Sequence, residues 1–320
     1  MINLSIMAPP AATPFADIER MVGYRHQVKD LAFFPRISAR SSLTGHHLSR
    51  TRGRGMDFDE VRPYQAGDDI RSIDWRITAR TTVPHTKLYR EERERPILII
   101  CDLRSGMFFG SQGMKSVTAC DLAAVLAWAG LAANDRVGGM VFSPGGQTDI
   151  RSKRSHHNVL RLIHSLEQAS QSLQSRSGES ASLAEITLDI RRVVTPGSSV
   201  FLISDFHDID AACETQLFHI SRHCDVTLLN VYDQLETQLP PPGHYRIFDG
   251  TQHRQLNTGD AKFRVSFEQR HRKQHQHLKQ TAERLRLPLL EFKTGQSIMP
   301  LLRQAFGQKT STSRKGRRGR

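Results

Sequence analysis

Short apolar segments alternate with longer segments of helical period from residue 96 onward. Residues 97–101 and 199–203 are apolar throughout, which is typical of strands buried on both faces. Residues 116–133 are rich in Ala and Leu, and residues 156–169 carry apolar side chains three and four positions apart, the spacing of an amphipathic helix. Because strands separated by helices of this length need crossover connections, the pattern predicts a doubly wound α/β fold with a mainly parallel sheet.

One antiparallel pair is expected within this sheet. Residues 136–142 and 147–150 read as strands that flank a Ser-Pro-Gly-Gly turn, which favours a hairpin. The Ser- and Gln-rich residues 170–182 read as a loop. The remaining expected elements are helices over about 183–194, 211–222, 260–286 and 298–306, strands over 226–231 and 289–292, and a β-ribbon over 245–248 and 253–256.

Residues 55–95 differ in character, because acids, bases and aromatic residues occur there at short intervals, separated by Pro and by Gly-Asp turns. Regularly placed apolar residues indicate that the segment is not left in water: Val61, Tyr64, Ile70, Ile73, Trp75 and Ile77. We therefore expect a small β-rich module that is partly buried and docked on the α/β domain. It should contain several Arg–carboxylate pairs. On this view Trp75 and Arg71 contribute to folding.

The formal net charge of +13 is concentrated in two flanking segments. Residues 309–320 hold six bases, residues 31–56 hold five, and neither segment holds an acid, which leaves only +2 for the rest. Such flanks could contact RNA, acidic lipid or an acidic protein surface. The chain is accordingly divided into a basic, partly ordered N-terminal segment (1–50), the β-rich module (51–95), the α/β domain (96–308) and a disordered basic tail (309–320).

Cysteine usage and the apolar segments indicate a cytoplasmic protein. The four cysteines show neither zinc nor disulfide spacing and are expected to be small buried hydrophobes in a reducing compartment: Cys101, Cys120, Cys213 and Cys224. Pro residues near the start stand where a signal helix would run. The longest apolar helical segment, residues 122–133, is shorter than the roughly 20 residues that cross a membrane, so no stable membrane insertion is expected.

A dense motif within the module resembles the signature of a bacterial family, domain-of-unknown-function family 58. The residues that carry the resemblance are Arg62, Tyr64, Gly67, Asp68, Asp69, Arg71, Asp74, Trp75, Arg76 and Arg80. In that family the motif precedes a von Willebrand factor A-like domain whose first strand is apolar and ends in Asp, here residues 97–102. The resemblance extends from about residue 52 to 306. It implies an interaction module that partners a MoxR-type AAA+ ATPase, and other von Willebrand A-like proteins as further partners, with no catalytic activity.

Two acidic residues follow strands that should be neighbours. Asp102 ends the first expected strand and Asp205 follows the fourth. Von Willebrand A-like domains resemble folds whose strands lie in the order 3-2-1-4-5-6. In that order the two carboxylates would lie side by side, at the point where the strand order reverses and ligands bind. Carboxylates and hydroxyls together suit Mg²⁺. The ordinary alternative is that either residue, taken alone, forms a turn or caps a helix after its strand.

The metal site looks degenerate. Adhesion sites that depend on a metal ion use Asp-x-Ser-x-Ser, but Arg104 and Gly106 replace both serines here, and Ser105 is out of register. Ser180 and Ser182 are the candidates for a further hydroxyl from a later loop. We expect no certain cofactor, with Mg²⁺ binding weak or absent, and Arg104 paired with Asp102 or Asp205 in place of the cation. A partner carboxylate approaching Arg104 would then complete the site.

Two other functions stay open. A metal-dependent hydrolase would use Asp102 and Asp205, with Asp208 and Asp210 as further acids. RNA binding would use the basic flanks, although residues 309–320 lack the aromatic residues of a dedicated nucleic-acid module. His271, His275 and His277 fall on one expected helix but read as a solvated basic face, and no phosphate-binding loop is present.

Overall fold

The computed structural model describes residues 14–29, 31, 56–65, 68–91, 95–173, 181–248 and 253–306. The chain divides into two compact units, one formed by residues 1–36 and 95–320 and the other by residues 37–94. The first unit is an α/β domain, and the second is a small module built on a two-stranded ribbon. The tail expected at residues 309–320 lies outside the described residues.

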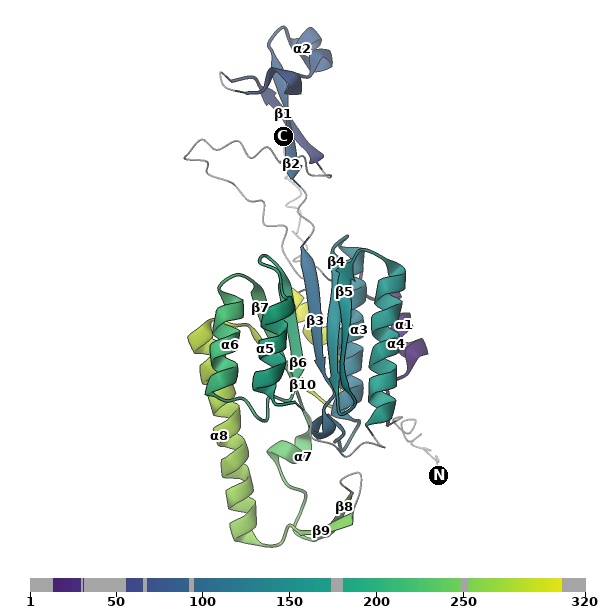
Figure 1. The fold of residues 1–320 in the computed structure, drawn as a ribbon, viewed down its shortest axis with the longest axis vertical. Coiled ribbons are helices and arrows are strands. Elements are labelled where there is room, and N and C mark those ends of the chain that lie inside the picture. The colour runs from purple at the N-terminus through teal and green to yellow at the C-terminus, as the bar shows by residue number, and fades with distance from the viewer. Residues whose placement is uncertain are drawn as a thin grey trace, which may run out of the picture. The chain divides into compact units, whose positions relative to one another are not determined.

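A six-stranded sheet forms the centre of the α/β domain (Figure 1). Its strands in spatial order are β10 (Leu289–Lys293), β7 (Asp225–Tyr232), β6 (Ser199–Ser204), β3 (Pro96–Asp102), β4 (Arg136–Ser143) and β5 (Gly146–Lys153). Neighbouring strands are parallel except in the β4–β5 hairpin. The doubly wound fold predicted from the sequence is therefore confirmed. The first and fourth strands of the domain, β3 and β6, are neighbours, so the strand order reverses between them.

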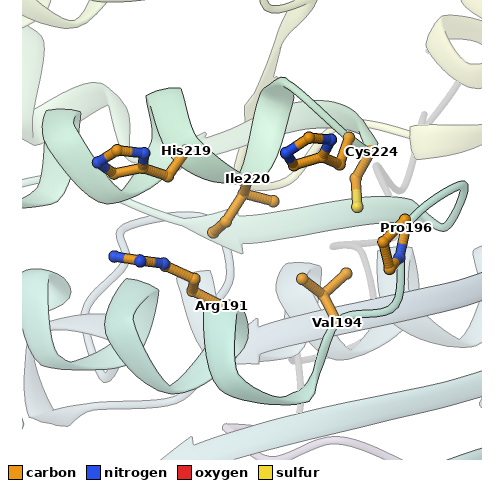
Figure 2. A pocket seen from close by; sticks show the side chains of 7 residues that line it. Arg191, Val194, Pro196, His219, Ile220 and Cys224 are labelled. Carbon is orange, nitrogen blue, oxygen red and sulfur yellow. The ribbon is translucent and has the colours of Figure 1, made fainter.

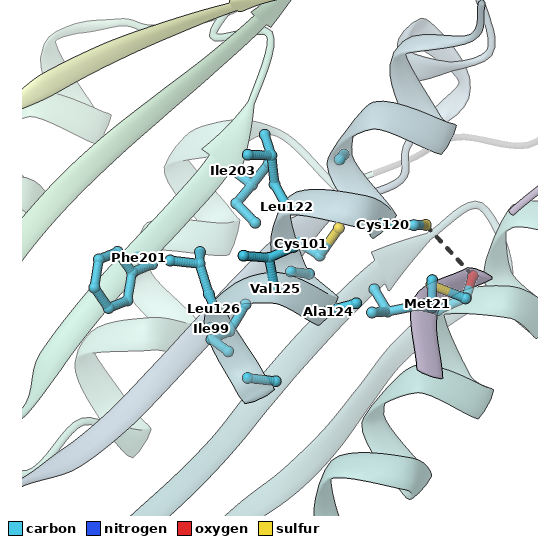
Figure 3. Close-up of a cluster of buried hydrophobic side chains, with 14 of the residues drawn as sticks. Met21, Ile99, Cys101, Cys120, Leu122, Ala124, Val125, Leu126, Phe201 and Ile203 are labelled. Atoms are coloured by element: carbon cyan, nitrogen blue, oxygen red, sulfur yellow. Dashed lines mark hydrogen bonds between the residues drawn. The ribbon is translucent and has the colours of Figure 1, made fainter. Parts of the chain in front are cut away.

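Helices cover both faces of the sheet, because successive residues of each buried strand point to opposite sides. In β3, Ile99 and Cys101 belong to one hydrophobic cluster, whereas Leu98 and Ile100 belong to the other. The helices that pack on the first face are α3 (Lys115–Ala132), α4 (His156–Ser172) and α9 (Ile298–Phe306), and those on the second face are α5 (Leu183–Val193), α6 (Ala211–Ser221) and α8 (Ala261–Leu285). Figure 3 shows the first cluster, where Leu126 of α3 lies beside Ile99 and Phe201 of the sheet.

Helix α3 lies within one residue of the helix expected over residues 116–133. It has 18 residues and begins at Lys115, ahead of the apolar segment at 122–133. By length and composition it could cross a membrane, but 78% of it is buried inside the fold. Every residue from Lys115 to Gly130 except Asp121 is buried. The helix is thus the central core helix of this domain, as its apolar composition led us to expect.

The N-terminal residues pack on α3 and α4. This stretch contains α1 (Ile18–Gly23) and the short 3-10 helix η1 (Tyr24–His26), and Met21 and Val28 belong to the first hydrophobic cluster. Three hydrogen bonds anchor it: Trp128 Nε1 to the Met21 carbonyl at 3.0 Å, the Ala16 amide to Ser170 Oγ at 3.0 Å, and Arg20 Nε to Asp121 Oδ1 at 3.1 Å. The boundary expected at residue 50 divides this stretch from the α/β domain. In the structure the stretch packs on that domain and belongs to the same unit.

Between β7 and β10 the chain forms an additional segment. It contains the short helix α7 (Gln234–Thr237), the ribbon of β8 (His244–Phe248) and β9 (His253–Asn257), and the long helix α8. Only Leu278, Thr281 and Ala282 of α8 are buried, all in its C-terminal half. Glu214 of α6 accepts hydrogen bonds from Thr281 and Arg284, which fixes this half to the domain.

The module consists of an antiparallel ribbon and two short helical turns. The ribbon pairs β1 (Met56–Pro63) with β2 (His85–Glu91), and η2 (Ile70–Ser72) and α2 (Trp75–Thr81) lie between them in sequence. The expected β-rich character is present, together with a helix that was not expected. Ile70 and Trp75 are 66% and 68% exposed, so the module itself does not bury these two side chains. Val61, Tyr64, Ile73 and Ile77 are partly buried.

All four cysteines are free and buried, as expected. Burial raises the pKa of the Cys213 thiol to about 12 and also raises the pKa of Cys224. These thiols are therefore neutral and unreactive packing groups.

Candidate functional site

Polar side chains occupy the carboxyl ends of four neighbouring strands. Asp102 ends β3, Ser204 ends β6 and is followed by Asp205, Asp233 follows β7, and Thr294 follows β10. Apart from Asp205, each is at most 1% exposed. Ligands of doubly wound domains bind at this edge, next to the point where the strand order reverses. We call the group formed around Asp102 and Asp205 the carboxyl-edge site.

Arg104 lies between two carboxylates of this site. Its Nε and Nη2 donate to Asp102 at 2.9 and 2.8 Å, and its Nη1 and Nη2 donate to Asp208 at 2.6 and 2.8 Å. Nη1 also donates to the Ala181 carbonyl at 3.0 Å. All five N–H groups of the guanidinium are thereby engaged. The pairing of Arg104 with a strand-end carboxylate is the arrangement that the sequence predicted.

Lys115 is a second internal cation. Its side chain is 1% exposed, and its Nζ lies 2.7 Å from Asp205 Oδ2 and 2.6 Å from Glu236 Oε1. Helix α3 brings the lysine to the site because Lys115 is its first residue. Helix α7 supplies Glu236, whose other oxygen accepts a hydrogen bond from the Asp233 amide in a capping box. The two strand-end aspartates are therefore held by different cations.

Asp233 fixes the loop that leads into α3. Its Oδ2 accepts hydrogen bonds from the amide and the hydroxyl of Ser111, at 2.8 and 3.0 Å, and from the Thr294 hydroxyl. Burial by itself raises the pKa of Asp233, but these hydrogen bonds outweigh it and hold the pKa below its ordinary value. Asp233 thus positions the loop before Lys115, and with it the lysine.

Mutual attraction keeps the buried groups of the site charged. Burial by itself raises the pKa of Asp205 and lowers that of Lys115, but the attraction between them outweighs burial and shifts both pKa values the other way. Burial likewise opposes ionisation of Asp208, yet the hydrogen bonds from Arg104 lower its pKa. All three groups are therefore charged at neutral pH.

The residues present do not fit a bound Mg²⁺. A magnesium site needs carboxylate oxygens that face a common point and are available to the ion. Here the oxygens of Asp102 accept hydrogen bonds from Arg104 and Ser204, and Asp205 is held by Lys115. Within the described ranges, no group of three His, Cys, Asp or Glu side chains is arranged to hold a metal ion. Two side-chain cations stand where a metal would be expected.

The candidate hydroxyl ligands lie away from this centre. Ser105 is exposed and makes no side-chain hydrogen bond to any residue that the structure describes. Ser182 caps α5 through a capping box with Glu185, so its hydroxyl serves the helix. Ser180 lies outside the described residues. The main chain of this loop reaches the site instead, because the Leu183 amide donates to Asp208 Oδ2 at 2.9 Å and Ala181 contacts Arg104.

The signature residues shape the module. Its described acids form turns and caps: Asp68 pairs with Arg62 at 2.8 Å and accepts the Gln65 amide, Asp69 caps η2, and Asp74 caps α2 and contacts Lys87 at 3.4 Å. The Tyr64 hydroxyl donates to the Asp68 carbonyl at 3.2 Å. Arg71, Arg76 and Arg80 are exposed and form no ion pair with a described residue, so the expected lattice of pairs is only partial. Gly67 lies outside the described residues.

Histidines of α8 contact carboxylates of neighbouring elements. His275 Nε2 lies 3.3 Å from Glu291 of β10, and His277 Nε2 lies 3.3 Å from Glu214 of α6. The rings of His271 and His275 stack at 5.9 Å. These contacts attach the helix to its neighbours and give the histidines a structural role.

A groove of about 240 Å³ lies at the opposite edge of the sheet, between α5 and α6 (Figure 2). Arg191 and His219 face each other across it, and Cys224 lies near Pro196 at its other end. The residues before β6 and β7 form this end, so the groove is separate from the carboxyl-edge site. Cys224 Sγ contacts the Thr195 carbonyl at 3.4 Å and has a raised pKa, which argues against a reactive role.

Sequence reasoning missed Lys115 and Glu236 and assigned Asp208 only to the hydrolase alternative. One signal was available for Glu236, because Asp233 and Glu236 have the spacing of a capping box. Lys115 stood out only as a single base at the start of an otherwise apolar helix. Its partners are 90 and 121 residues away in the sequence, so no local pattern reveals the pairing.

Strand order and site together define the class of this protein. Its strand order, with one antiparallel edge strand and with aspartates after the adjacent first and fourth strands, is the arrangement expected from the resemblance to von Willebrand A-like domains. Two side-chain cations, Arg104 and Lys115, hold these aspartates. In sequence, the small signature module lies between the N-terminal stretch of this unit and its sheet.

The chain belongs to the family described as protein of unknown function DUF58, which it matches over residues 60–277. The resemblance inferred from the signature is thus confirmed. Uncharacterized proteins of Mycobacterium bovis and Mycobacterium tuberculosis are 29% identical to it over 211 residues. The match covers 65% of this chain and 64% of each relative, so the chain spans a little under two thirds of their length.

Two solved structures show more distant similarity. The conserved hypothetical protein BatB from Bacteroides thetaiotaomicron is 16% identical, with a TM-score of 0.41 and coverage of 66% of this chain and 95% of that chain. A von Willebrand factor type A protein from Catenulispora acidiphila is 11% identical, with a TM-score of 0.34 and coverage of 47% and 35%.

Proposed function

We propose that this protein is a cytoplasmic interaction module that partners a MoxR-type AAA+ ATPase and contacts it at the carboxyl-edge site. Family membership supports an interaction role, and the resemblance described above suggests the ATPase. The proposal rests on one observation. At the adhesion-type site, side-chain cations hold the two strand-end aspartates. A metal-dependent hydrolase would need the metal site that these residues do not form.

The geometry favours a basic partner group over the carboxylate expected from the sequence. Every N–H of Arg104 is already engaged, so an incoming carboxylate would have to displace Asp102 or Asp208. The four acids of the site, Asp102, Asp205, Asp208 and Glu236, outnumber Arg104 and Lys115 and leave a formal charge of −2. A basic group is therefore attracted to the site, and an acid is repelled.

Asp208 is the most accessible carboxylate of the site. Its side chain is 39% exposed, against 1% for Asp102 and 12% for Asp205. Its Oδ1 accepts one hydrogen bond from a described residue, Arg104, and a carboxylate oxygen can accept two. We infer that a Lys or Arg of the partner binds this oxygen, while Arg104 and Leu183 hold the carboxylate in place.

The test is a pull-down of the purified ATPase with the full chain, with and without ATP. Asp208→Asn keeps the shape of the side chain but removes its charge, and we expect it to weaken binding about tenfold or more. Asp189→Asn is the matched control, because Asp189 is also an Arg-paired aspartate of similar exposure, at 34%. If the ATPase binds neither the wild type nor the variant, the proposed function is overturned. Equal binding by wild type and Asp208→Asn overturns the assignment of the site.

A further inference from the structure

Residues 70–83 of the module expose an unusual share of apolar surface. Seven large hydrophobic residues in the described part of the chain are exposed, and three of them lie here: Ile70 at 66%, Trp75 at 68% and Val83 at 49%. Scattered exposed aliphatic residues need no explanation, but tryptophan is highly buried on average. The exposure of Trp75 therefore needs a functional explanation.

Helix α2 has two distinct faces. At 100° per residue, Trp75, Ala79, Arg76 and Arg80 lie within about 140° of its circumference. All four are exposed, whereas Ile77 and Thr78 on the remaining arc are partly buried. We call the exposed set the Trp–Arg face. Its inner counterpart packs toward the ribbon, where the Thr78 hydroxyl accepts a hydrogen bond from the His85 amide at 3.1 Å.

The three acids of the signature do not balance the charge of the Trp–Arg face. Asp68, Asp69 and Asp74 are each used in a turn, a cap or a pair with another residue. Arg76 and Arg80 form no ion pair with a residue that the structure describes, and the same holds for nearby Arg71. The face thus presents an aromatic side chain between guanidinium groups that are available to a partner.

We propose that the Trp–Arg face is a docking surface for an acidic segment of a protein partner, with Trp75 as its apolar anchor. The proposal rests on the proposed function in taking that partner to be the ATPase. Trp and Arg are the residues most enriched among those that dominate protein interfaces. Guanidinium groups pair with carboxylates in a bidentate geometry that ammonium groups cannot match.

The neighbouring residues favour a protein over a nucleic acid. Binding of single strands uses several aromatic side chains on which successive bases stack. Here one exposed aromatic residue is accompanied by Ile70 and Val83, which offer no ring for stacking but suit an apolar protein contact. The acidic partner segment should therefore carry an apolar side chain that packs on Trp75.

The experiment measures the affinity of the ATPase for the full chain and for two variants of the Trp–Arg face. Trp75→Ala and the double variant Arg76→Glu/Arg80→Glu should each weaken binding by about tenfold or more. Leu160→Ala and Arg161→Glu are the matched controls, because both residues are exposed on α4 of the other unit. They should bind like wild type. Equal affinity of all variants overturns the docking surface but leaves the proposed function intact.

A second probe does not depend on the ATPase. Poly-L-glutamate is titrated while Trp75 emission is followed, taken as the difference between wild type and Trp75→Phe. A saturable change that is lost in Arg76→Glu/Arg80→Glu is expected, and its absence contradicts the proposal. Tighter binding of a single-stranded oligonucleotide, with quenching of Trp75, would assign the face to nucleic acid instead. Blue-shifted Trp75 emission in the free chain would show that the protein covers the face itself.

Discussion

At the scale of single residues, Lys115 is the group whose environment most constrains substitution. Its ammonium is 1% exposed and depends on two carboxylates, Asp205 and Glu236. A buried charge that loses a partner is strongly destabilising, because the remaining partner does not replace the lost hydration. Asp205, which the sequence alone places in the candidate ligand site, therefore also has a role in stability.

Asp205→Ala should lower the free energy of unfolding by roughly 3–5 kcal/mol, because it leaves Lys115 with Glu236 alone. Urea denaturation measures the change. Asp208→Ala is the comparison, since its carboxylate is 39% exposed and Arg104 keeps Asp102 as a partner. It should be clearly less destabilising. Equal losses for the two variants would contradict the central role given to Lys115.

Arg104→Ser should give the site measurable affinity for Mg²⁺, whereas wild type should show no saturable binding. The substitution frees the oxygens of Asp102 and adds a hydroxyl at the position that adhesion sites use. Adding Gly106→Ser should strengthen binding, because a Cβ at this position would lie 3.4 Å from Asp205 Oδ2. Calorimetry with Mg²⁺ and Mn²⁺ provides the measurement. Tight, stoichiometric binding by wild type would reverse the argument and support the hydrolase alternative.

At the scale of elements, the module gains its order from capping carboxylates. Asp74 caps α2 by accepting the Arg76 and Ile77 amides, and the Ile77 amide is the leading cause of its lowered pKa. Trp75 and Arg71, by contrast, are exposed side chains. In place of the expectation that these two side chains contribute to folding, we expect the Asp74 cap to do so.

Trp75→Ala and Arg71→Ala should each change stability by no more than about 0.5 kcal/mol, as exposed substitutions usually do. Asp74→Ala should lower the melting temperature of the module, because it leaves two amides of α2 without an acceptor. Circular dichroism during thermal melting compares the three variants. A large destabilisation by Trp75→Ala would show that the side chain is buried in solution.

The contact between α1 and α3 gives a pH dependence. Burial raises the pKa of Asp121 from 3.8 to about 6, although Arg20 opposes the shift. The folded state thus binds this proton more tightly than the unfolded state, and stability is lost as the pH rises from about 4 to about 6. Relative to Asp121→Asn, wild type should lose roughly 2 kcal/mol over this range.

Urea denaturation at several pH values measures the difference between wild type and Asp121→Asn. Glu19→Gln, at an exposed position of α1, controls for the removal of a negative charge. A difference that stays constant between pH 4 and pH 6 would show that Asp121 is more hydrated than the structure indicates.

The elements that the sequence predicted are those with strong periodicity. Strand β3 is apolar up to its final Asp102, and α5 repeats apolar residues at helical spacing. Both were located to within one or two residues. Helix α7, with four residues, has too few positions to show a period. Asp102 and its pairing with Arg104 could be inferred because both lie at one strand end. The cluster around Lys115 could not, because three elements distant in the sequence supply it.

At the scale of the whole molecule, the family match crosses the boundary between the two units. Residues 60–277 include most of the module and most of the α/β domain, so the combination of the two defines the family. The basic segment 309–320 falls outside this match.

Deleting residues 309–320 should leave the melting temperature unchanged and weaken only contacts that depend on salt, because six bases act through charge. Binding to an acidic surface, measured between low and high ionic strength, should lose most of its salt dependence in the truncated chain. A large drop in melting temperature would indicate that the segment packs on the rest of the protein.

The covalent attachment of Arg104 and Lys115 has a consequence for regulation. A divalent ion can be removed by a chelator, exchanged for another ion, or drawn away by nucleotide phosphates. Side-chain cations cannot leave the chain, so the state of this site is independent of the free Mg²⁺ that ATP hydrolysis continually alters. EDTA should therefore leave the site intact.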